Sequence, residues 1–433
     1  MRLRSQYDGE ILRLAVPALG ALAAEPLYVL VDTGIVGHLG RPQLAALGIA
    51  ATVLTSLFGV FNFLQYGTTA QVGRASGAGE AQIANRLGAQ ALWLSLGFGA
   101  AIAAGVLALA PWIVELMGGE GDTADYAVTY MRIAALGLPF AFLALGGQGY
   151  LRGVADLRTP LVIVIAANVV NAVLEVLFVY GFDWGIEGSA WGTVIAQAGM
   201  GVAFVVVILR AGGGDTRPAR TLMRRLIVIG RHIFVRTAAL LSAFTLAGAV
   251  IARFGDASLA AHQVAFQLWI FLAFVLDAIA IAGQVIVGRG LGAGDTERAY
   301  AASVRMIWLS VWAGVAFGAV MLALEGALPY AFTSDEAVVE RAQAIWPLFA
   351  LMQPLNGAVF ALDGILIGAG DGRYLMWSMV AAFAACAAVS LAALALDAGI
   401  VGVWVALVVL ICVRLALMLS RFRGRRWLVT GWA

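Results

Sequence analysis

The sequence predicts an all-α integral membrane protein in which twelve transmembrane helices form two parallel six-helix repeats. Three observations support this prediction. Hydrophobic residues make up 62% of the 433-residue chain and charged residues only 12%, which is too little charge for a soluble domain. The apolar stretches are long enough to cross about 30 Å of hydrocarbon as helices of roughly 20 residues or more. The chain also repeats itself at a fixed offset of 215 residues.

The repeat is clearest in two glycine-rich segments, 72–80 (VGRASGAGE) and 287–295 (VGRGLGAGD). Two copies of one unit in an apolar chain indicate a transporter whose site lies where the copies face each other. Six spans is an even number, so both copies enter the membrane from the same side and the repeats are parallel. The same offset aligns Trp93 with Trp308, Pro139 with Pro354, Gly153 with Gly368, Asp156 with Asp371 and Arg158 with Arg373.

The apolar runs give the spans in order, and none shows the polar–apolar alternation of barrel strands. In the first copy we expect helices at about 11–37, 44–71, 87–110, 124–151, 159–181 and 187–209. In the second copy we expect them at about 226–252, 259–287, 300–324, 337–367, 373–396 and 399–420. The chain is therefore divided into an N-terminal six-helix lobe (1–210), a cytoplasmic linker (211–225) and a C-terminal six-helix lobe (226–433).

Arginine predicts the orientation, because the chain contains no lysine. Arginines gather before the first span, in the linker and in the tail, whereas the loops of the opposite side are richer in acids. The positive-inside rule then places both termini and the linker in the cytoplasm, in a multi-pass protein of the cell (inner) membrane. The first span is too long for the apolar region of a cleaved signal peptide.

Several chemistries are not expected. Cys386 and Cys412 fall inside predicted spans, and His38, His232 and His262 are scattered, so no metal cluster or disulfide framework is indicated. The glycine-rich loops lack the Gly-Lys-Ser/Thr ending that cradles phosphate, and the net charge of +2 gives no argument for nucleic acid. We therefore expect a monomeric transporter of small organic substrates in the bilayer, without enzymatic activity or a cofactor.

The intramembrane carboxylates distinguish the two copies. Asp32 falls opposite Ala247, and Glu175 opposite Ser390. A carboxylate in hydrocarbon is costly to ionise, so it usually faces a cavity or a partner and marks a functional site. At 1.5 Å per residue, Asp32 and Glu175 lie roughly 8 and 9 Å below the outer ends of their spans, so they can meet in one layer. Glu25, Asn168 and Asn171 are likewise polar in the first copy only, opposite Leu240, Phe383 and Cys386.

The C-terminal half has a different polar set, made of Arg236, Asp277 and Asp363. Arg236 lies about ten residues into its span, deep enough to need a counter-ion. We expect Asp277 to be that partner and the set to stabilise the structure rather than couple an ion.

The segment 26–40 (PLYVLVDTGIVGHLG) resembles multidrug and toxic compound extrusion (MATE) transporters of the DinF subfamily. The resemblance covers nearly the whole chain and includes the paired glycine loops, Thr159-Pro160, Leu276-Asp277 and the spaced residues Asn168, Asn171 and Glu175. It implies two six-helix bundles around a central cavity and cation-coupled export of organic, cationic or amphipathic compounds.

Carried over by position, the resemblance implies a network in the N-terminal lobe that responds to H⁺ or Na⁺. Its members are Tyr28, Asp32, Asn171, Glu175 and Thr193, with Glu25 as a further titrating candidate. A sodium ion, if that is the coupling ion, would bind at Asp32, Asn171 and Glu175. Residues expected to line the substrate cavity are Asn168, Gln148, Gln65 and Asn62.

Two departures from the family pattern leave the coupling ion open. The acid of the fifth span is usually Asp, and Glu25 has no counterpart in the pattern. A flippase for lipids or lipid-linked oligosaccharides, from the same wider superfamily, is the main alternative, although it would favour a basic cavity. A major facilitator symporter also has twelve spans, but its Gly-x-x-x-Asp-Arg-x-Gly-Arg-Arg loop is absent.

Overall fold

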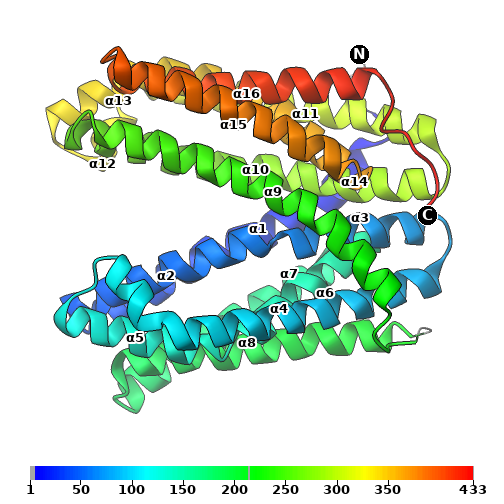
Figure 1. The fold of residues 1–433 in the computed structure, drawn as a ribbon, viewed down its shortest axis with the longest axis horizontal. Helices are drawn as coiled ribbons and strands as arrows, with labels where there is room; N and C mark the ends of the chain where they lie inside the picture. Colours follow the sequence, from blue (N-terminus) through cyan, green and yellow to red (C-terminus); the bar gives the residue numbers. More distant parts are fainter. Residues whose placement is uncertain (1–4, 213–214, 433) are drawn as a thin grey trace. The chain divides into compact units, whose positions relative to one another are not determined.

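The structure is a computed structural model that describes residues 5–212 and 215–432, except for the side chain of Glu25. Within those residues every regular element is a helix and no strand occurs. Ten helices are long and apolar enough to cross a membrane, or up to twelve if each of two bent helix pairs counts as one span. The predicted all-α membrane fold is confirmed (Figure 1).

The first half of the chain forms eight α-helices and one π-helical turn. In order these are α1 (Asp8–Gly37), α2 (Arg41–Phe61), α3 (Phe63–Gly77), α4 (Ala81–Leu116), α5 (Gly121–Ala135), α6 (Leu138–Gly153), α7 (Arg158–Val176), η1 (Leu177–Gly181) and α8 (Gly185–Arg210). The second half forms α9 (Arg220–Ala252), α10 (Asp256–Gly292), α11 (Thr296–Ala323), α12 (Leu328–Phe332), α13 (Glu336–Leu351), α14 (Gln353–Gly368), α15 (Gly372–Ala395) and α16 (Gly399–Arg423).

The spans expected at 124–151 and 337–367 are both bent. The axes of α5 and α6 differ by 52°, and those of α13 and α14 by 49°. Pro139 and Pro354 stand in the first turns of α6 and α14, where the missing N–H costs no hydrogen bond but the preceding helix cannot continue. The proline pair of the repeat thus marks a shared bend that length and hydropathy alone did not predict.

A glycine pair lets these bends pack closely. A Cβ on Gly99 of α4 would lie 2.7 Å from Cα of Pro139, and one on Gly314 of α11 would lie 2.8 Å from Cα of Pro354. Real Cβ atoms do not approach backbone so closely, so neither position accepts a side chain without a backbone shift. Gly99 and Gly314 are separated by the repeat offset, which makes this contact part of the duplicated scaffold.

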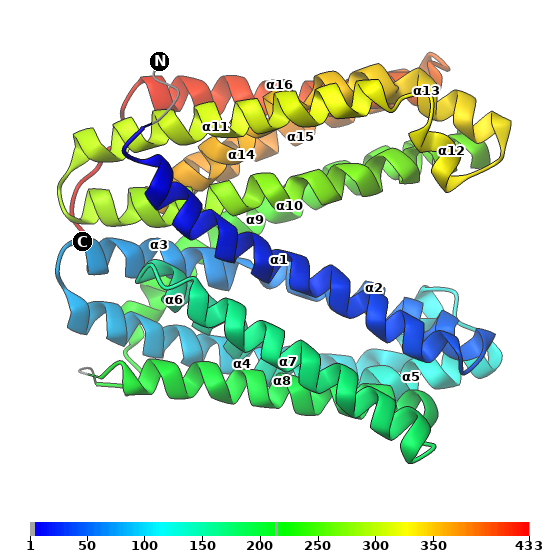
Figure 2. The same ribbon diagram turned by 180° about the vertical axis from the view of Figure 1, so that it is seen from behind.

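The chain divides into two compact units. We call Gly20–Gly230 the N-terminal unit, and Arg231–Ala433 together with Met1–Leu19 the C-terminal unit. The boundaries fall inside α1, which is continuous in Figure 2, and inside α9. The lobes expected from the sequence at 1–210 and 226–433 stay a prediction about the repeats. The compact units have other bounds, because the beginning of α1 belongs to the C-terminal unit and the beginning of α9 to the N-terminal unit.

Each unit is built around one central helix, α6 in the N-terminal unit and α14 in the C-terminal unit, and these two helices correspond in the repeat. In the N-terminal unit α6 packs against α3, α4 and α8, and α7 packs along α8. In the C-terminal unit α14 packs against α10 and α11, while α15 and α16 lie side by side (Figures 1 and 2). The core residues of α6 and α14 are largely glycine, alanine and leucine, which allow close helix contacts in a bilayer.

Candidate functional site

The N-terminal unit brings together polar side chains from α1, α7 and α8. Asp32 lies on α1, Asn171 and Glu175 lie one turn apart on α7, and Thr193 lies on α8. Residues four apart on a helix share a face, so Asn171 and Glu175 are directed the same way. All four are buried, and Glu175 is 0% exposed. The structure thus places four of the residues expected for ion coupling in one buried cluster.

Thr193 is the centre of the hydrogen bonds in this cluster. Its hydroxyl donates to Oε1 of Glu175 at 3.4 Å and accepts from Nδ2 of Asn171 at 3.3 Å. The hydroxyl of Tyr28 lies 3.1 Å from Oγ1 of Thr193. Because the single proton of Thr193 is given to Glu175, Tyr28 must be the donor in that contact. One hydroxyl therefore joins α1, α7 and α8.

The two carboxyl groups lie close together. Asp32 and Glu175 interact with each other, and Oδ1 of Asp32 accepts a hydrogen bond from Oγ of Ser189 at 2.8 Å. Two oxygens of the cluster, Oε2 of Glu175 and Oδ1 of Asn171, have no hydrogen-bond partner among the described residues. A buried acceptor without a donor is costly, so these oxygens are positions where a proton or a cation would be stabilised.

Two members of the cluster were not predicted from the sequence. Tyr130 of α5 is buried and interacts with Asp32 and Tyr28, and Ser189 of α8 is the hydroxyl donor to Asp32. A signal for both was available in the repeat. Tyr130 falls opposite Ile345 and Ser189 opposite Trp404, so each is polar in the first copy only, as Asp32 is.

Glu25 lies within α1, but its side chain is outside the described part of the structure, so its role stays a prediction. Among the described residues no group of three or more His, Cys, Asp and Glu side chains is arranged to hold a metal ion. The sodium site expected at Asp32, Asn171 and Glu175 stays a prediction.

The four residues expected in the substrate cavity do not form one group. Nε2 of Gln65 donates to Oε1 of Gln148 at 3.0 Å and joins α3 to α6. Nδ2 of Asn168 donates to the carbonyl of Ala24 at 2.9 Å and joins α7 to α1. Asn62 lies at the junction of α2 and α3, where its buried Oδ1 has no described partner. Their placement at a substrate cavity stays a prediction.

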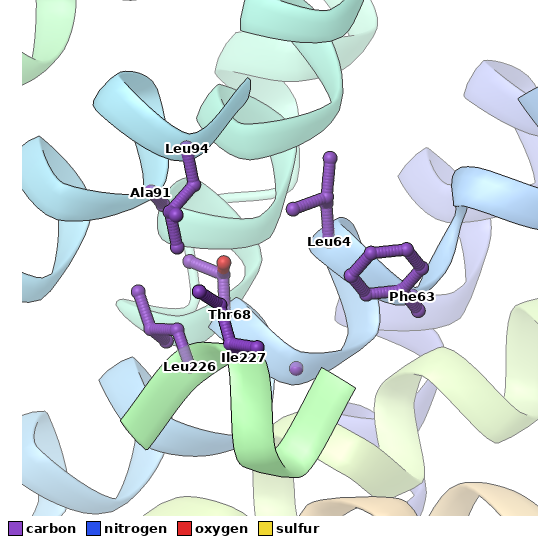
Figure 3. A pocket seen from close by; sticks show the side chains of 8 residues that line it. Phe63, Leu64, Thr68, Ala91, Leu94, Leu226 and Ile227 are labelled. Atoms are coloured by element: carbon purple, nitrogen blue, oxygen red, sulfur yellow. The ribbon is translucent and has the colours of Figure 1, made fainter. Parts of the chain in front are cut away.

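A small pocket in the N-terminal unit lies elsewhere. It is formed by α3, α4 and the beginning of α9 (Figure 3), and Thr68 supplies its one side-chain hydroxyl. None of the expected cavity residues lines it. The lining residues are Phe63, Leu64, Gly67, Thr68, Ala91, Leu94, Leu226 and Ile227.

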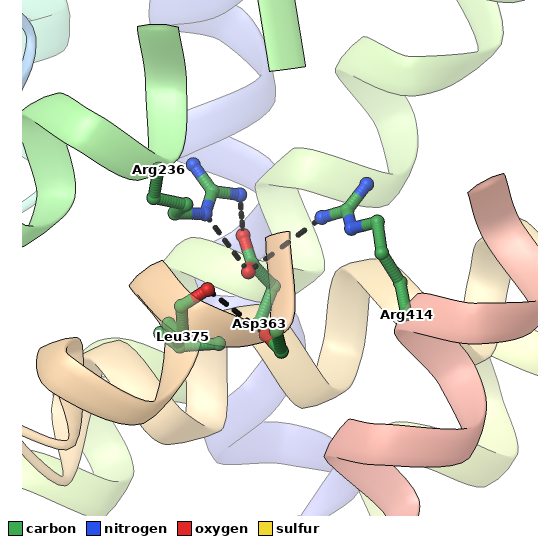
Figure 4. Close-up of polar contacts among 5 residues, drawn as sticks. Arg236, Asp363, Leu375 and Arg414 are labelled. Carbon is green, nitrogen blue, oxygen red and sulfur yellow. Dashed lines mark hydrogen bonds and ion pairs between the residues drawn. The ribbon is translucent and has the colours of Figure 1, made fainter. Parts of the chain in front are cut away.

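The C-terminal unit contains a second buried polar cluster, made of Arg236 on α9, Asp363 on α14 and Arg414 on α16. Nε of Arg236 donates to Oδ1 of Asp363 at 3.1 Å, and Nη2 of Arg236 pairs with Oδ2. Nη2 of Arg414 lies 3.6 Å from Oδ1 of the same carboxylate. Figure 4 shows the two guanidinium groups approaching Asp363 from different sides.

This cluster corrects the expected pairing. We expected Asp277 to be the counter-ion of Arg236, but Asp363 takes that place. Asp277 lies on α10, and no reasoning from depth along the helix could decide which of two carboxylates on different helices faces Arg236. Arg414, nine residues before the end of α16, was not among the polar residues singled out from the sequence.

The chain is similar to a known protein family and to several of its members. The family model described as MatE matches residues 17–177 and again 233–393, one match in each copy of the repeat. The chain is 30% identical to Protein DETOXIFICATION 44, chloroplastic, of Arabidopsis thaliana, over 94% of this chain and 80% of that protein. It is 28% identical to DNA damage-inducible protein F of Escherichia coli, over 100% of this chain and 95% of that protein.

Two further similarities concern transport and fold. The chain is 27% identical to Multidrug resistance protein PmpM of Pseudomonas aeruginosa, over 87% of this chain and 81% of that protein. A solved structure described as MATE in the bent conformation superimposes with a TM-score of 0.89 at 20% identity, covering 98% of this chain and 96% of the other. At that identity the structural match concerns the fold alone.

Proposed function

The chain belongs to the MatE family of multidrug efflux transporters, and from this premise we propose that it exports organic, cationic or amphipathic compounds in exchange for H⁺. The observation that carries the choice of ion is the pair formed by Asp32 and Glu175 inside the N-terminal unit. Two carboxylates side by side in a buried environment repel each other, and a proton shared between them removes that repulsion. The pair is therefore a site whose charge depends on proton binding.

Proton binding would change the packing of α1. Tyr28 and Asp32 both stand on α1 and bind Thr193 and Ser189 on α8, and Asp32 also interacts with Glu175 on α7. The charge of the pair therefore affects how α1 is held. Pro17 and Pro26 each remove one backbone hydrogen bond within α1, which makes bending there less costly. Antiport requires that substrate affinity differ between the two charge states. The deprotonated pair favours a cationic substrate group, and the protonated pair does not.

Sodium is the second coupling ion that the cluster supports. The unpartnered Oε2 of Glu175 and Oδ1 of Asn171 are hard oxygen ligands beside a second carboxylate. A cation bound there would satisfy both oxygens at once. Coupling to H⁺ and coupling to Na⁺ differ only in the gradient that drives transport, so an experiment that imposes one gradient at a time distinguishes them.

The decisive experiment measures export of a fluorescent organic cation from proteoliposomes that contain the purified full chain. An imposed pH gradient with equal sodium on both sides is compared with a sodium gradient at equal pH. We expect the pH gradient to drive transport. Transport driven by sodium alone would assign Na⁺ instead, and transport by neither gradient in protein that binds the cation would contradict antiport.

We also propose that the chain is a monomer of the cell's inner membrane with both termini in the cytoplasm. The arginine bias of the loops supports this orientation. A reporter that fluoresces only in the cytoplasm, fused after residue 433, tests it. Fluorescence supports the orientation, and a dark fusion together with an active periplasmic reporter at the same position contradicts it.

A further inference from the structure

The polar cluster of the C-terminal unit contains an excess of positive charge. Arg236, Asp363 and Arg414 come from three helices, and the side chains are only 10%, 12% and 6% exposed. Two guanidinium groups share one carboxylate, so the three side chains together carry one positive charge. In a membrane span an uncompensated charge is costly, and such residues usually line a pathway or a binding site.

The two arginines are not held equally. Arg236 makes a two-point contact with Asp363, through Nε and Nη2, which satisfies the carboxylate and fixes the guanidinium plane. Arg414 has only a single contact with that carboxylate, at 3.6 Å, and makes no hydrogen bond with any other described residue. A guanidinium has five N–H donors. Most of the donor capacity of Arg414 is therefore not used by the described residues, although the side chain is only 6% exposed.

The depth of the cluster argues against a role at the membrane surface. Arg414 stands nine residues before the end of α16, and Asp363 five residues before the end of α14. At 1.5 Å per residue these are about 14 and 8 Å from the helix ends. Lipid phosphates at the interface lie too far away to neutralise Arg414 easily, so the compensating anion must come into the protein.

We propose that Arg414, positioned by the Arg236–Asp363 pair, is an anion-binding subsite that recognises the carboxylate of an amphiphilic organic substrate. A carboxylate matches the planar fork of a guanidinium and would use the donors that Asp363 leaves free. The proposal rests on the proposed export function and narrows its substrate class. Compounds that carry a carboxylate on an apolar body, including zwitterions, become preferred over simple cations.

The charge arrangement explains why Asp363 does not abolish such a site. Its two oxygens are engaged by Arg236, whose positive charge offsets the negative charge of Asp363. An arriving carboxylate therefore meets an almost neutral pair and one under-used cation. Without Arg236, the full negative charge of Asp363 would lie beside Arg414 and repel an arriving carboxylate, which would weaken the subsite. Arg236 and Asp363 are positioning residues, and Arg414 is the residue that contacts the ligand.

The test uses purified full chain in detergent and equilibrium dialysis with 1-naphthoate and its neutral isostere 1-naphthamide. We expect wild-type protein to bind the carboxylate at least about tenfold more tightly than the amide, which corresponds to about 1.4 kcal/mol. Arg414→Gln should remove this discrimination while leaving binding of the amide unchanged. The matched control is Arg421→Gln on the same helix, which disrupts an ion pair with Asp371 outside the cluster and should keep the discrimination.

Each other outcome contradicts the proposal. Equal binding of carboxylate and amide, or full discrimination by Arg414→Gln, would remove Arg414 as a carboxylate site. Loss of naphthoate binding in chloride buffer, with chloride stabilising wild type but not Arg414→Gln, would assign a small inorganic anion instead. Should the glutamine variant not fold, Arg414→Lys keeps the charge without the planar fork and should lower the discrimination several-fold.

The assay also separates this proposal from the proposed function. Binding is measured without any gradient, so it does not depend on ion coupling. Protein carrying Asp32→Asn should keep the full preference for naphthoate. Anion binding with no gradient-driven export would contradict antiport only, and export without anion discrimination would contradict the subsite only.

Discussion

The two compact units share one scaffold and carry opposite polarity. The N-terminal unit buries Asp32 and Glu175 among hydroxyl and amide groups, whereas the C-terminal unit buries two arginines around one aspartate. In the alignment of the two copies, each of these charged residues corresponds to an uncharged one. The pairs are Asp32 and Ala247, Glu175 and Ser390, Arg236 and Ala21, Asp363 and Gln148, and Arg414 and Gly199. Duplication supplied the helices and their bends, and the chemistry lies where the copies differ.

Because the acid pair and the arginine cluster lie in different units, the comparison predicts different roles for the two units. The acid pair of the N-terminal unit should respond to the coupling ion, and the arginine cluster of the C-terminal unit should fix structure and substrate preference. Substitutions in the acid pair should change the ion dependence of transport without unfolding the protein. Substitutions in the arginine cluster should change stability or substrate preference and leave the ion dependence unchanged.

The largest effect is expected from Asp32→Asn. Asparagine keeps the size and can still accept a hydrogen bond from Ser189, but it fixes the neutral form, so the protein should insert and lose essentially all gradient-driven export. Efflux of a fluorescent cation from cells that lack other pumps measures this, with membrane levels matched by blotting. The control is Glu115→Gln at the exposed end of α4, which should export normally. Export at the wild-type rate by Asp32→Asn would move attention to Glu175 and Glu25.

The second largest effect tests the other unit. Arg236→Ala leaves Asp363 with only the weak contact from Arg414, and breaking a buried pair by removing one partner costs about 3–5 kcal/mol. We therefore expect lower yield and a lower thermal midpoint, while the remaining protein keeps its dependence on the driving ion. Arg231→Ala, at an exposed position of the same helix, is the matched control. Stable protein that has lost its response to the ion would break the division between the units.

Much of this comparison was available from the sequence, and the reason is physical. Hydropathy and the repeat offset predicted the helices, and a polar residue present in one copy only proved a good guide to the acid cluster, including Tyr130 and Ser189, which we did not use. What could not be predicted was rotation about helix axes. Depth along a helix does not say whether Asp277 or Asp363 faces Arg236, and Arg414 was not singled out from the sequence at all. Nor could it group Asn62, Gln65, Gln148 and Asn168 into one cavity.

A smaller effect is expected at the centre of the acid cluster. Thr193→Val keeps the shape but removes the hydroxyl that Tyr28, Asn171 and Glu175 all contact. Leaving buried polar groups without a partner costs about 1–3 kcal/mol each, although small shifts recover part of this. Coupled export should fall roughly tenfold, which corresponds to about 1.4 kcal/mol. Thr193→Ser retains the hydroxyl and should export nearly normally. Equal export by the valine and serine variants would mean that the hydroxyl has no part in coupling.

The units also differ in how they hold the chain at the start of a repeat's first helix. In the N-terminal unit α4 holds the segment before α9 by neutral bonds: Gln90 binds the carbonyl of Arg217 and the N–H of Ala219, and Trp93 binds the carbonyl of Thr216. In the C-terminal unit α11 holds the beginning of α1 by ion pairs. These contacts agree with a division of the compact units inside α1 and α9. Gln90 and Trp93 fall opposite Arg305 and Trp308 in the repeat.

The ionic contacts between α11 and the beginning of α1 consist of one mostly buried ion pair and one exposed ion pair. Arg305 binds Asp8 through Nε at 2.7 Å and Nη2 at 2.8 Å, and its guanidinium lies 4.3 Å from the ring centre of Trp308. Arg298 binds Glu10 at 2.9 Å, but these side chains are 54% and 38% exposed. The first pair is bidentate and mostly shielded, whereas salt in solution reaches the second.

The smallest effect is therefore expected from Glu10→Gln. An exposed ion pair contributes about 0.2–1 kcal/mol and is screened by salt, so the thermal midpoint should fall slightly at low ionic strength and match wild type at high ionic strength. Asp8→Asn should cost more and retain part of its effect in salt, because Arg305 is only 4% exposed. Trp93→Phe, which removes one of the neutral hydrogen bonds of α4, should show no dependence on salt. Thermal unfolding of the three variants across a salt series measures all of this. If salt affects Trp93→Phe as strongly as Glu10→Gln, the ion pairs of α11 and the neutral hydrogen bonds of α4 do not differ in their dependence on salt, and the comparison is contradicted.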